Sequence, residues 1–460
     1  MDYCRGYFRQ KTCTWNGSLF VGALFFLVAL PGNCFAQVDI RRHYPSAAFE
    51  ASLAEVQTFD PSCLKDGAVT LVEGRVSQAP IMRYMEGFAK LAGVTGGLTK
   101  QNMIVSSILD TDPRQDQRPI NGTLRWAVEA AREAGGGWIS FDSNLGAQPQ
   151  IDLKAPLRLP SNITIDGGCA GITLTAEPDD AIVLALAKTQ NIVLTRLRFQ
   201  KRGTTTPKSG GDCVTVGQGS DRLWVAFNSL RNCGDGTIDI TQSRASDTPT
   251  RVTVAFNHFT DHDKTMIVGT LDCQQPGETG PAWCDHPWEK EWSWTTGVQV
   301  TLQGNVFAAT GQRHPRLSGR AFVHMIDTVI ASRPRPRSTG GEGASYGSYV
   351  ESGGRLIVDS TLYAPLSRQK CFDAVRSPSH SCFISHERRA LGAVSLTNVV
   401  VLGNGRAAAE NEEKALRPPY ALEPMLDFAR NPEHTAKCAA QMVGPGGAFR
   451  TVEAPCQPRQ

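Results

Sequence analysis

The sequence predicts an all-β fold, a β-solenoid in which short strands stack coil upon coil. From about Asn162 onward, short runs of β-branched and apolar residues alternate with polar turns, and helical periodicity is nearly absent. Short strands at quasi-regular intervals are typical of a sandwich, a barrel or a solenoid. The runs include residues 163–165, 192–194, 214–216, 223–225, 237–240, 252–254, 298–301 and 394–401.

Two details favour the solenoid. An asparagine follows the apolar run in several repeats, at Asn228, Asn257 and Asn305, as expected if asparagine side chains stack inside a turn. Asp212 and Asp235 lie about one solenoid coil apart. Hairpin turns such as Asn-Gly, which a sandwich would need between its strands, are scarce.

The clearest helix precedes the repeats, at residues 122–132, and has apolar residues on one face. We expect this N-terminal helix to cap the open end of the solenoid, because an uncapped coil would expose unpaired strand edges.

The chain begins with a segment typical of an export signal. Residues 19–30 are almost entirely apolar and follow three basic residues, and small residues precede a cleavage point after Ala36. The alternative is a membrane anchor, but the apolar stretch is short for spanning a bilayer. Removing this segment, which holds three bases and one acid, brings the formal charge of +3 closer to zero. Attraction for a polyanion must therefore come from a local patch.

Ten of the thirteen cysteines follow the predicted cleavage point, and an even number after an export signal predicts disulfides. The pairs nearest in sequence are our first candidates, while Cys213 and Cys233 are interpreted as stacked core residues on neighbouring coils. The candidate pairs are Cys273 with Cys284, Cys371 with Cys382, and Cys438 with Cys456.

Acidic residues and one lysine recur between Gly211 and Gly269, in the order Asp212, Asp235, Asp239 and Lys264. Asp235 and Asp239 would lie roughly 13 Å apart in an uninterrupted strand, so Gly236 must supply a bend if one ion is to contact both. Clustered carboxylates are the usual source of the oxygen ligands of calcium. The alternative is that Asp235 is a turn residue and Asp239 a solvated strand residue.

Two blocks of sequence carry a family resemblance. The first is residues 235–269, including His262-Asp263-Lys264, and the second is residues 312–316, Gln-Arg-His-Pro-Arg, followed by Val323-His324. In these blocks, and at residues 87–89, 95–97, 122–127 and 163–167, the chain resembles the pectate lyases of polysaccharide lyase family 1. The resemblance implies a right-handed, single-stranded parallel β-helix.

The resemblance also implies roles for individual residues. Calcium would be held by Asp212, Asp235 and Asp239, and Lys264 would contact a substrate carboxylate. Arg313 would abstract the proton, with Arg316 and Arg320 binding substrate.

Two departures from the family pattern stand out. Trp224-Val225-Ala226-Phe227 replaces a Trp-Ile-Asp-His motif, so an acidic element is lost. The second arginine of the family falls at Ser318 by direct count, and Arg320 can take its place only if the intervening loop is longer.

The implied reaction is β-elimination on de-esterified polygalacturonate, giving 4,5-unsaturated oligogalacturonides. Calcium and Lys264 would stabilise the negative charge that develops when the C5 proton leaves. A free arginine stays protonated at ordinary pH, so Arg313 acts as a base only if neighbouring cations lower its proton affinity.

Two further segments bear on substrate binding. The loop from Cys273 to Thr296 carries four tryptophans that either wall the cleft or pack the loop onto the β-helix. Arg333, Arg335 and Arg337 form either a basic track for the polymer or a solvated linker.

The expected organisation has four parts: a signal peptide at 1–36, an N-terminal extension without readable chemistry at 37–86, a parallel β-helix catalytic domain at 87–403, and a C-terminal tail at 404–460 packed on the outside. We expect a secreted monomer, extracellular or periplasmic, whose partner is an acidic polysaccharide and neither nucleic acid nor, after signal removal, a membrane.

Two other functions compete with the lyase. A glycoside hydrolase of the polygalacturonase type would use paired carboxylates, but leaves Lys264 and Arg313 without a necessary role. A non-catalytic calcium- or sugar-binding β-helix would keep the aspartates for the ion alone. A pectin lyase acting on methylated polymer is disfavoured by the three aspartates, because a neutral ester does not need calcium.

Overall fold

A computed structural model describes most of the chain after residue 37. The described residues are 38–54, 68–115, 118–146, 148–168, 171–176, 182–200, 211–217, 219–242, 248–269, 296–334, 346–350, 354–366, 372–376, 393–403, 405–407 and 416–445. All of them belong to one compact unit, residues 36–460. The predicted signal peptide lies outside them. No helix of the described residues is long and apolar enough to cross a membrane.

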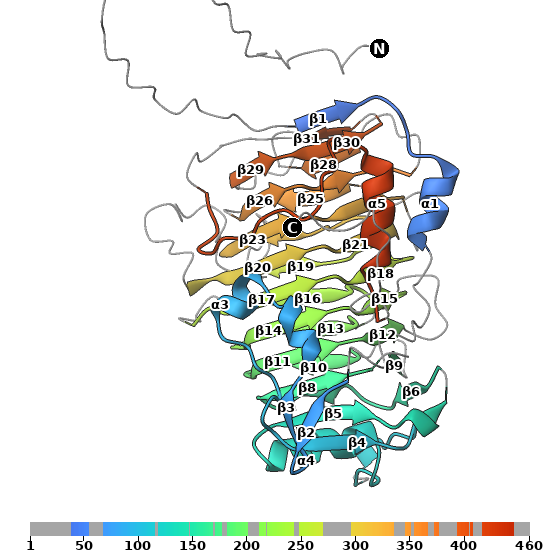
Figure 1. The fold of residues 1–460 in the computed structure, drawn as a ribbon, viewed down its shortest axis with the longest axis vertical. Helices are drawn as coiled ribbons and strands as arrows, with labels where there is room; N and C mark the ends of the chain where they lie inside the picture. Colours follow the sequence, from blue (N-terminus) through green and yellow to red (C-terminus); the bar gives the residue numbers. More distant parts are fainter. Residues whose placement is uncertain are drawn as a thin grey trace, which may run out of the picture. The chain divides into compact units, whose positions relative to one another are not determined.

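The described strands form three parallel sheets, each running along a stack of coils, so the predicted right-handed parallel β-helix is confirmed (Figure 1). Sheet 1, in spatial order, contains β1 (Val38–Arg41), β30 (Val399–Leu402), β27 (Leu362–Tyr363), β24 (Val329–Ser332), β21 (Val306–Thr310), β18 (His258–Thr260), β15 (Ser229–Arg231), β12 (Leu197–Gln200), β9 (Ile172–Ala176) and β6 (Gln150–Leu153). Sheet 2 contains β31 (Gly405–Ala407), β28 (Phe372–Arg376), β25 (Tyr346–Val350), β22 (Arg316–Ser318), β19 (Ile267–Gly269), β16 (Ile238–Thr241), β13 (Val214–Val216), β10 (Leu184–Leu186) and β7 (Leu157–Arg158). Sheet 3 contains β29 (Ala393–Thr397), β26 (Arg355–Asp359), β23 (Ala321–Ile326), β20 (Val298–Gln303), β17 (Thr250–Ala255), β14 (Asp221–Ala226), β11 (Gln190–Thr195), β8 (Ile163–Asp166), β5 (Gly137–Phe141) and β4 (Asn102–Val105). Each coil adds one strand to each sheet, because a parallel neighbour needs a full crossover connection.

The predicted asparagine stack is confirmed at the turn between sheets 3 and 1. Asn257 Oδ1 accepts hydrogen bonds from the backbone N–H of Asn228 at 2.9 Å and from its side-chain Nδ2 at 3.0 Å. Asn305 Oδ1 accepts the equivalent pair from Asn257 at 3.0 and 3.1 Å. All three side chains are fully buried. Each amide therefore satisfies the backbone of the coil before it, which fixes the spacing of successive coils.

The inside of the stack is apolar. Alternate strand residues point inward, and valine, isoleucine and leucine fill the space between the three sheets. Phe259 and Phe307 stack there with ring centroids 4.4 Å apart. Polar chemistry is thus confined to the turns and to the outward strand positions.

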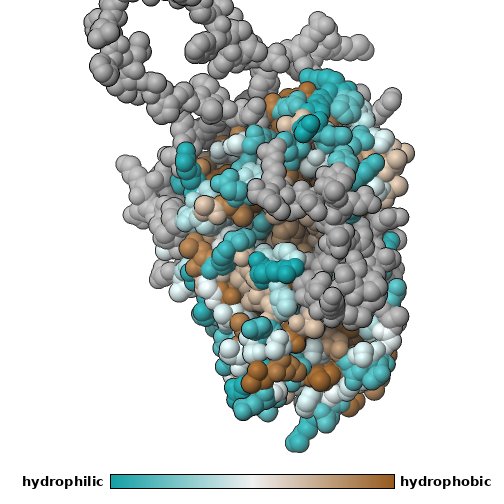
Figure 2. Space-filling model, viewed as in Figure 1, coloured by the Kyte–Doolittle hydropathy of each residue, from teal (hydrophilic) through white to brown (hydrophobic). Residues whose placement is uncertain are grey.

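The predicted capping helix is confirmed as α4 (Leu124–Glu133), which contacts β4 and β5 at the first coil (Figure 1). Thr123 begins the helix, and its hydroxyl accepts a hydrogen bond from the backbone N–H of Trp126 at 3.2 Å. Figure 2 shows apolar side chains near this end of the molecule. The exposed large apolar residues include Leu71, Val72, Ile104, Ile108, Leu109 and Ile120.

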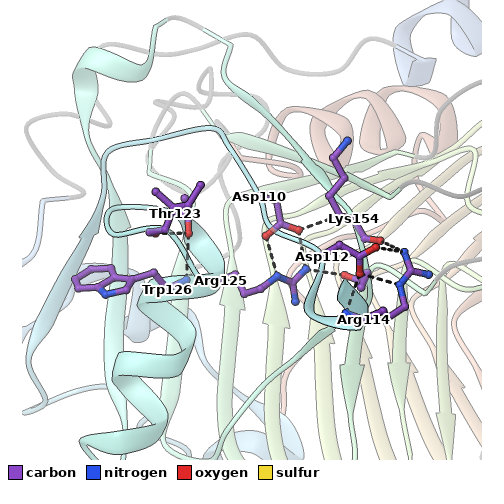
Figure 3. Close-up of polar contacts among 9 residues, drawn as sticks. Asp110, Asp112, Arg114, Thr123, Arg125, Trp126 and Lys154 are labelled. Carbon is purple, nitrogen blue, oxygen red and sulfur yellow. Dashed lines mark hydrogen bonds and ion pairs between the residues drawn. The ribbon is translucent and has the colours of Figure 1, made fainter. Parts of the chain in front are cut away.

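A polar network fastens the cap to the loops beneath it (Figure 3). Arg125 of α4 makes a two-pronged ion pair with Asp110, at 2.8 and 2.7 Å, and both side chains are almost completely buried. Asp110 also accepts the backbone N–H of Lys154 at 2.8 Å. Beside it, Arg114 pairs with Asp112 nearer the surface, which lowers the pKa of Asp112 mainly through the hydrogen bond from Arg114.

Segments from both ends of the chain cover the outside. At the last coil β1 pairs in parallel with β30, and α1 (Ala47–Ala54) contacts α5 (Pro432–Gln441) (Figure 1). At the first coils lie the hairpin of β2 (Thr70–Val72) and β3 (Arg75–Gln78), followed by short helices. These are η1 (Pro80–Tyr84), η2 (Pro113–Gln115) and η3 (Ser143–Leu145), whereas α3 (Gly87–Leu91) packs farther along the stack, against β17 and β20.

The outer face of sheet 3 holds the segment around α3. Thr301 and Thr253 accept hydrogen bonds from the backbone N–H groups of Phe88 and Ala89, at 3.1 and 2.9 Å. The resembling residues 87–89 therefore have a structural role as a cover over this sheet.

Cys213 and Cys233 are buried on neighbouring coils, as expected, but stacking is not their whole relation. They form a disulfide, with Cα atoms 5.3 Å apart, between the turns that precede β13 and β16. The turns of adjacent coils bring the two residues together, which sequence spacing did not indicate. Cys438 is also disulfide-bonded, and the other cysteines of the candidate pairs lie outside the described residues.

The buried ion pair of the cap predicts a large loss of stability on Arg125→Met, because Asp110 would keep a buried charge without its partner. We expect the free energy of unfolding to fall by about 3–5 kcal/mol, measured by denaturant-induced unfolding. Arg114→Met is the control: that arginine side chain is 57% exposed, and its loss should cost less than about 1 kcal/mol. Equal losses in the two variants would contradict the role assigned to Arg125.

Candidate functional site

The candidate site lies on the outer side of sheet 2, at the turns that lead into its middle strands. Asp212 precedes β13, Asp235 precedes β16, Lys264 precedes β19 and Arg313 precedes β22. Backbone hydrogen bonds join these turns, from Thr237 N–H to the Thr265 carbonyl at 2.8 Å and from Thr265 N–H to the Gln312 carbonyl at 3.0 Å. Residues 24 to 48 positions apart are therefore brought onto adjacent coils of one face.

Asp212 and Asp239 both face Gly236. Asp212 accepts hydrogen bonds from the Gly236 N–H at 2.8 Å and from the Thr215 hydroxyl at 2.7 Å. Asp239 accepts the Ile267 N–H at 3.0 Å. A Cβ atom on Gly236 would lie only 2.5 Å from Asp239 Oδ1 and 3.0 Å from Asp212 Oδ1. The missing side chain of Gly236 thus leaves a small space between the two carboxylates.

The negative charges of Asp212 and Asp239 are only partly balanced by neighbouring positive charge. Burial, followed by the neighbouring charge of Asp212, raises the pKa of Asp239 to about 8. Burial likewise raises the pKa of Asp212, with a smaller contribution from Asp235. The charge of Arg313 acts in the opposite direction on both pKa values. A second positive charge between the aspartates would therefore be bound favourably.

Asp235 is turned toward Lys264, whose Nζ atom donates to Asp235 Oδ1 at 2.9 Å. The ring Nε2 of His262 is 2.6 Å from the Asp235 carbonyl oxygen and is almost completely buried. His262 thus holds the backbone of this turn while the carboxylate remains accessible. The resembling block contains His262 but indicates no role for it; its position two residues before Lys264 is the only signal in the sequence.

Arg313 precedes β22 of sheet 2, close enough for its charge to act on Asp212 and Asp239. Its side chain is partly buried, and its Nε has no hydrogen-bond partner in the structure as described. The following residue, His314, is fully buried, and burial lowers its pKa to about 3. Its Nε2 is 2.8 Å from the Thr310 hydroxyl. A neutral His314 therefore anchors the turn that presents Arg313.

Arg316 and Arg320 are placed differently. Arg316 occupies the outward position of β22 that is in register with Ile267, itself beside Asp239, and its guanidinium lies 5.5 Å from the centre of the Tyr349 ring. Arg320 lies beyond the strand and donates a hydrogen bond to the Thr296 hydroxyl. Ser318 is at the end of β22, in register with Gly269.

The residue types suit a calcium ion, although the side chains are not already gathered around one point. Among the described residues, no group of three or more Asp, Glu, His or Cys is arranged to hold a metal as it stands. Asp212 and Asp239 supply hard oxygen donors around the space at Gly236. Asp235 reaches the same space if its carboxylate leaves Lys264. The residues present fit a calcium ion that neutralises them.

Three other expectations concern the surroundings of this face. The Trp-rich loop, Arg335 and Arg337 lie outside the described residues. Arg333 donates to Glu50 of α1, so an acid of the chain already balances part of its charge; its part in a basic track or a solvated linker stays a prediction. Phe227, which stands where the family motif has its histidine, stacks on Phe256 with ring centroids 4.9 Å apart, so aromatic packing occupies this position.

The sequence is similar to curated pectate lyases, although no family model matches it. It is 29% identical over 245 residues to probable pectate lyase 13 of Arabidopsis thaliana, a match that covers 51% of this chain and 40% of that protein. It is 30% identical over 231 residues to pectate lyase 1 of Juniperus ashei, covering 46% and 53%. The chain thus spans about half the length of the curated relatives it matches.

A solved structure supports the fold. The crystal structure of jun a 1, the major allergen from cedar pollen, aligns with 78% of this chain and 92% of its own, with a TM-score of 0.53 and 19% identity. At this identity the likeness concerns the fold alone. Together with the sequence matches it confirms the resemblance that the motifs indicated.

The raised pKa of Asp239 predicts a pH-dependent stability in the presence of a chelator. Between about pH 4 and pH 8 the folded protein keeps a proton that the unfolded chain releases, so this contribution to stability is lost as the pH rises through that window. Asp239→Asn should weaken the fall in melting temperature between these pH values, whereas Asp152→Asn, on the outside of sheet 1, should not. Parallel pH profiles for wild type and Asp239→Asn would contradict the assignment.

Proposed function

We propose that this relative of pectate lyases is itself a secreted pectate lyase, cleaving de-esterified polygalacturonate by calcium-dependent β-elimination. The observation that carries the proposal is the placement of Asp212, Asp239, Lys264 and Arg313 on successive coils of one outer face. Such a face offers cations and a cation site to a substrate that carries one carboxylate per sugar.

Asp212, Asp239 and Asp235 are the residues that would hold calcium. When bound, the ion would withdraw negative charge from the substrate carboxylate next to the reacting carbon. The protein residues around it then have separate tasks. Lys264 pairs with Asp235 in the structure, and it is positioned to exchange this carboxylate for that of the substrate.

Arg313 is the proposed base. It would remove the C5 proton of a galacturonate residue; the electron pair of that C–H bond forms the C4–C5 double bond, and the C4–O bond breaks with the leaving chain taking the electrons. No water is consumed, so the products are 4,5-unsaturated oligogalacturonides. An arginine must lose its own proton before it can act, and an alkaline medium favours this step.

Arg316 is the proposed contact for a neighbouring substrate carboxylate. It shares the outward face of sheet 2 with the aspartates, and the Tyr349 ring lies beside its guanidinium. Arg320 is the weaker candidate, since it already donates to Thr296.

One observation also favours the hydrolase. An Asp239 carboxyl that keeps its proton near neutral pH, next to a second carboxylate, matches the acid and base pair of a glycosidase. The two reactions leave different products. Hydrolysis gives saturated reducing ends, and elimination gives unsaturated ends that absorb ultraviolet light.

The deciding experiment incubates the full chain with polygalacturonate and calcium, following ultraviolet absorbance and reducing ends in parallel. The lyase requires both signals to rise together and both to vanish with a chelator. Reducing ends without absorbance would establish hydrolysis, and neither signal would leave a binding protein.

Arg313→Lys tests the base, because lysine keeps the positive charge while moving the proton-accepting nitrogen. We expect kcat to fall at least about a hundredfold, with little change in KM. Arg222→Lys is the matched control: both arginines have a positive φ, +65° and +62°, so backbone strain is equal. A comparable loss in both variants would remove Arg313 from its role.

Gly236→Ala tests the cation site. The added methyl group would press on the carboxylates of Asp239 and Asp212, so the calcium concentration for half-maximal activity should rise at least about tenfold, and calorimetry should show weaker calcium binding. In Gly217→Ala the nearest atom is the Leu186 carbonyl oxygen at 3.3 Å, and calcium affinity should stay unchanged. Unaltered calcium affinity in Gly236→Ala would place the ion elsewhere.

A further inference from the structure

A second group of basic residues lies near one end of sheet 2, the sheet whose middle strands carry the candidate site. A cavity of about 300 Å³ opens between α4 and the turns that follow β7 and β10. Its charged lining residues, Arg132, Arg158 and Lys188, are all cations. The hydroxyl-bearing Ser161 and Thr189 lie among them, and Leu159, Pro160 and two alanines supply an apolar wall.

The charge of this basic cavity is only partly balanced. Arg132 pairs with Glu129 at 3.0 Å, and its Nη2 donates to the Arg158 carbonyl at 2.7 Å. Arg158 and Lys188 are exposed, and within the described part of the chain neither has an ion-pair partner. Two cations held near each other without an acid would gain from an anionic ligand.

The strand register connects the basic cavity to the aspartates. Arg158 of β7 is in register with Ala185 of β10, Ala185 with Thr215 of β13, and Thr215 with Asp239 of β16. The flanking residues of these strands are buried, so all four positions face outward. Three strand spacings separate Arg158 from Asp239, roughly 14 Å.

The side chains between the basic cavity and the candidate site are small. Only Ala185 and Thr215 stand between Arg158 and Asp239 in this row of outward positions, and both side chains are small. Along this row of described positions, an extended polymer that occupies the candidate site could therefore continue over small side chains. At the far end it would reach cations, hydroxyl groups and an apolar wall, the combination that suits an acidic sugar.

We propose that the basic cavity is a remote binding site for an acidic sugar, where Arg158 and Lys188 hold the carboxylate of a uronate residue of the same chain that occupies the candidate site. The proposal rests on the proposed function for the identity of the polymer. It adds a site that anchors longer chains and takes no part in bond cleavage.

The test measures binding separately from catalysis. The full chain carrying Lys264→Ala and Arg313→Ala is titrated by calorimetry, in a chelator and at low salt, with a long oligogalacturonide. Residual binding is expected, and adding Arg158→Gln with Lys188→Asn should weaken it about tenfold. Asparagine suits position 188 because Lys188 has a φ of +57°.

A control variant removes the same number of cations elsewhere. Arg231→Gln with Lys90→Asn takes one arginine from sheet 1 and one lysine from α3, each exposed and ion-paired. This control should leave binding unchanged. Replacing the ligand by its methyl-esterified form should remove binding altogether. Equal weakening in both double variants, no residual binding, or equal affinity for the neutral oligomer would each overturn the proposal.

A second readout uses catalysis in the otherwise wild-type chain. Arg158→Gln with Lys188→Asn should raise KM for long oligomers, leave KM for the shortest cleaved oligomer unchanged, and leave kcat unchanged. A rise in KM for both lengths would overturn the remote position. If the chain has no lyase activity but the calorimetric difference persists, the proposed function fails while the acidic-sugar site stands, so the two failures are distinguishable.

Discussion

The parallel register from coil to coil is the constraint on which the rest of the structure depends. Every functional side chain discussed above comes from a turn or an outward strand position, and its neighbours are set by the coils on either side. The buried asparagines fix this spacing, because each amide bonds to the backbone of the preceding coil. A slip of one residue in one coil would move its outward residues into the apolar interior.

The same register places two partly buried carboxylates close together, and the apolar interior offers no charge to balance them. Asp212 and Asp239 are placed on adjacent coils around Gly236, where burial raises both pKa values; the charge of Asp235 adds to the shift of Asp212, and the charge of Asp212 adds to that of Asp239. The charge of Arg313 lowers both pKa values and so offsets these shifts only in part. An arrangement of this kind is destabilising unless a cation neutralises it, and such arrangements cluster at functional sites. Fold stability must then come from elsewhere.

Segments of the chain that lie outside the three sheets, or join one at its end, cover the stack of coils. At the first coil, α4 is fastened by the buried pair of Arg125 and Asp110. Along the outside, Asp327 accepts the backbone N–H groups of Met425 and Leu426, and burial raises its pKa to about 7. At the last coil, β1 adds a parallel strand beside β30. The N-terminal residues 38–41, for which the sequence offered no chemistry, thus pair with β30 and form the last strand of sheet 1.

The sequence by itself determined the solenoid, its strands, the capping helix and the asparagine stack, because each rests on a local pattern: alternation along a strand, one apolar helix face, or one residue type at one turn. It also marked the acidic positions and the arginine, since these stand out as charged residues beside apolar runs. Only the tertiary structure decided which of them meet. The disulfide of Cys213 with Cys233, the turn of Asp235 toward Lys264, the pairing of Arg333 with Glu50 and the alignment of Arg158 with Asp239 all depend on how coils stack. That register is set by contacts between residues 20 to more than 200 positions apart, which no local pattern contains.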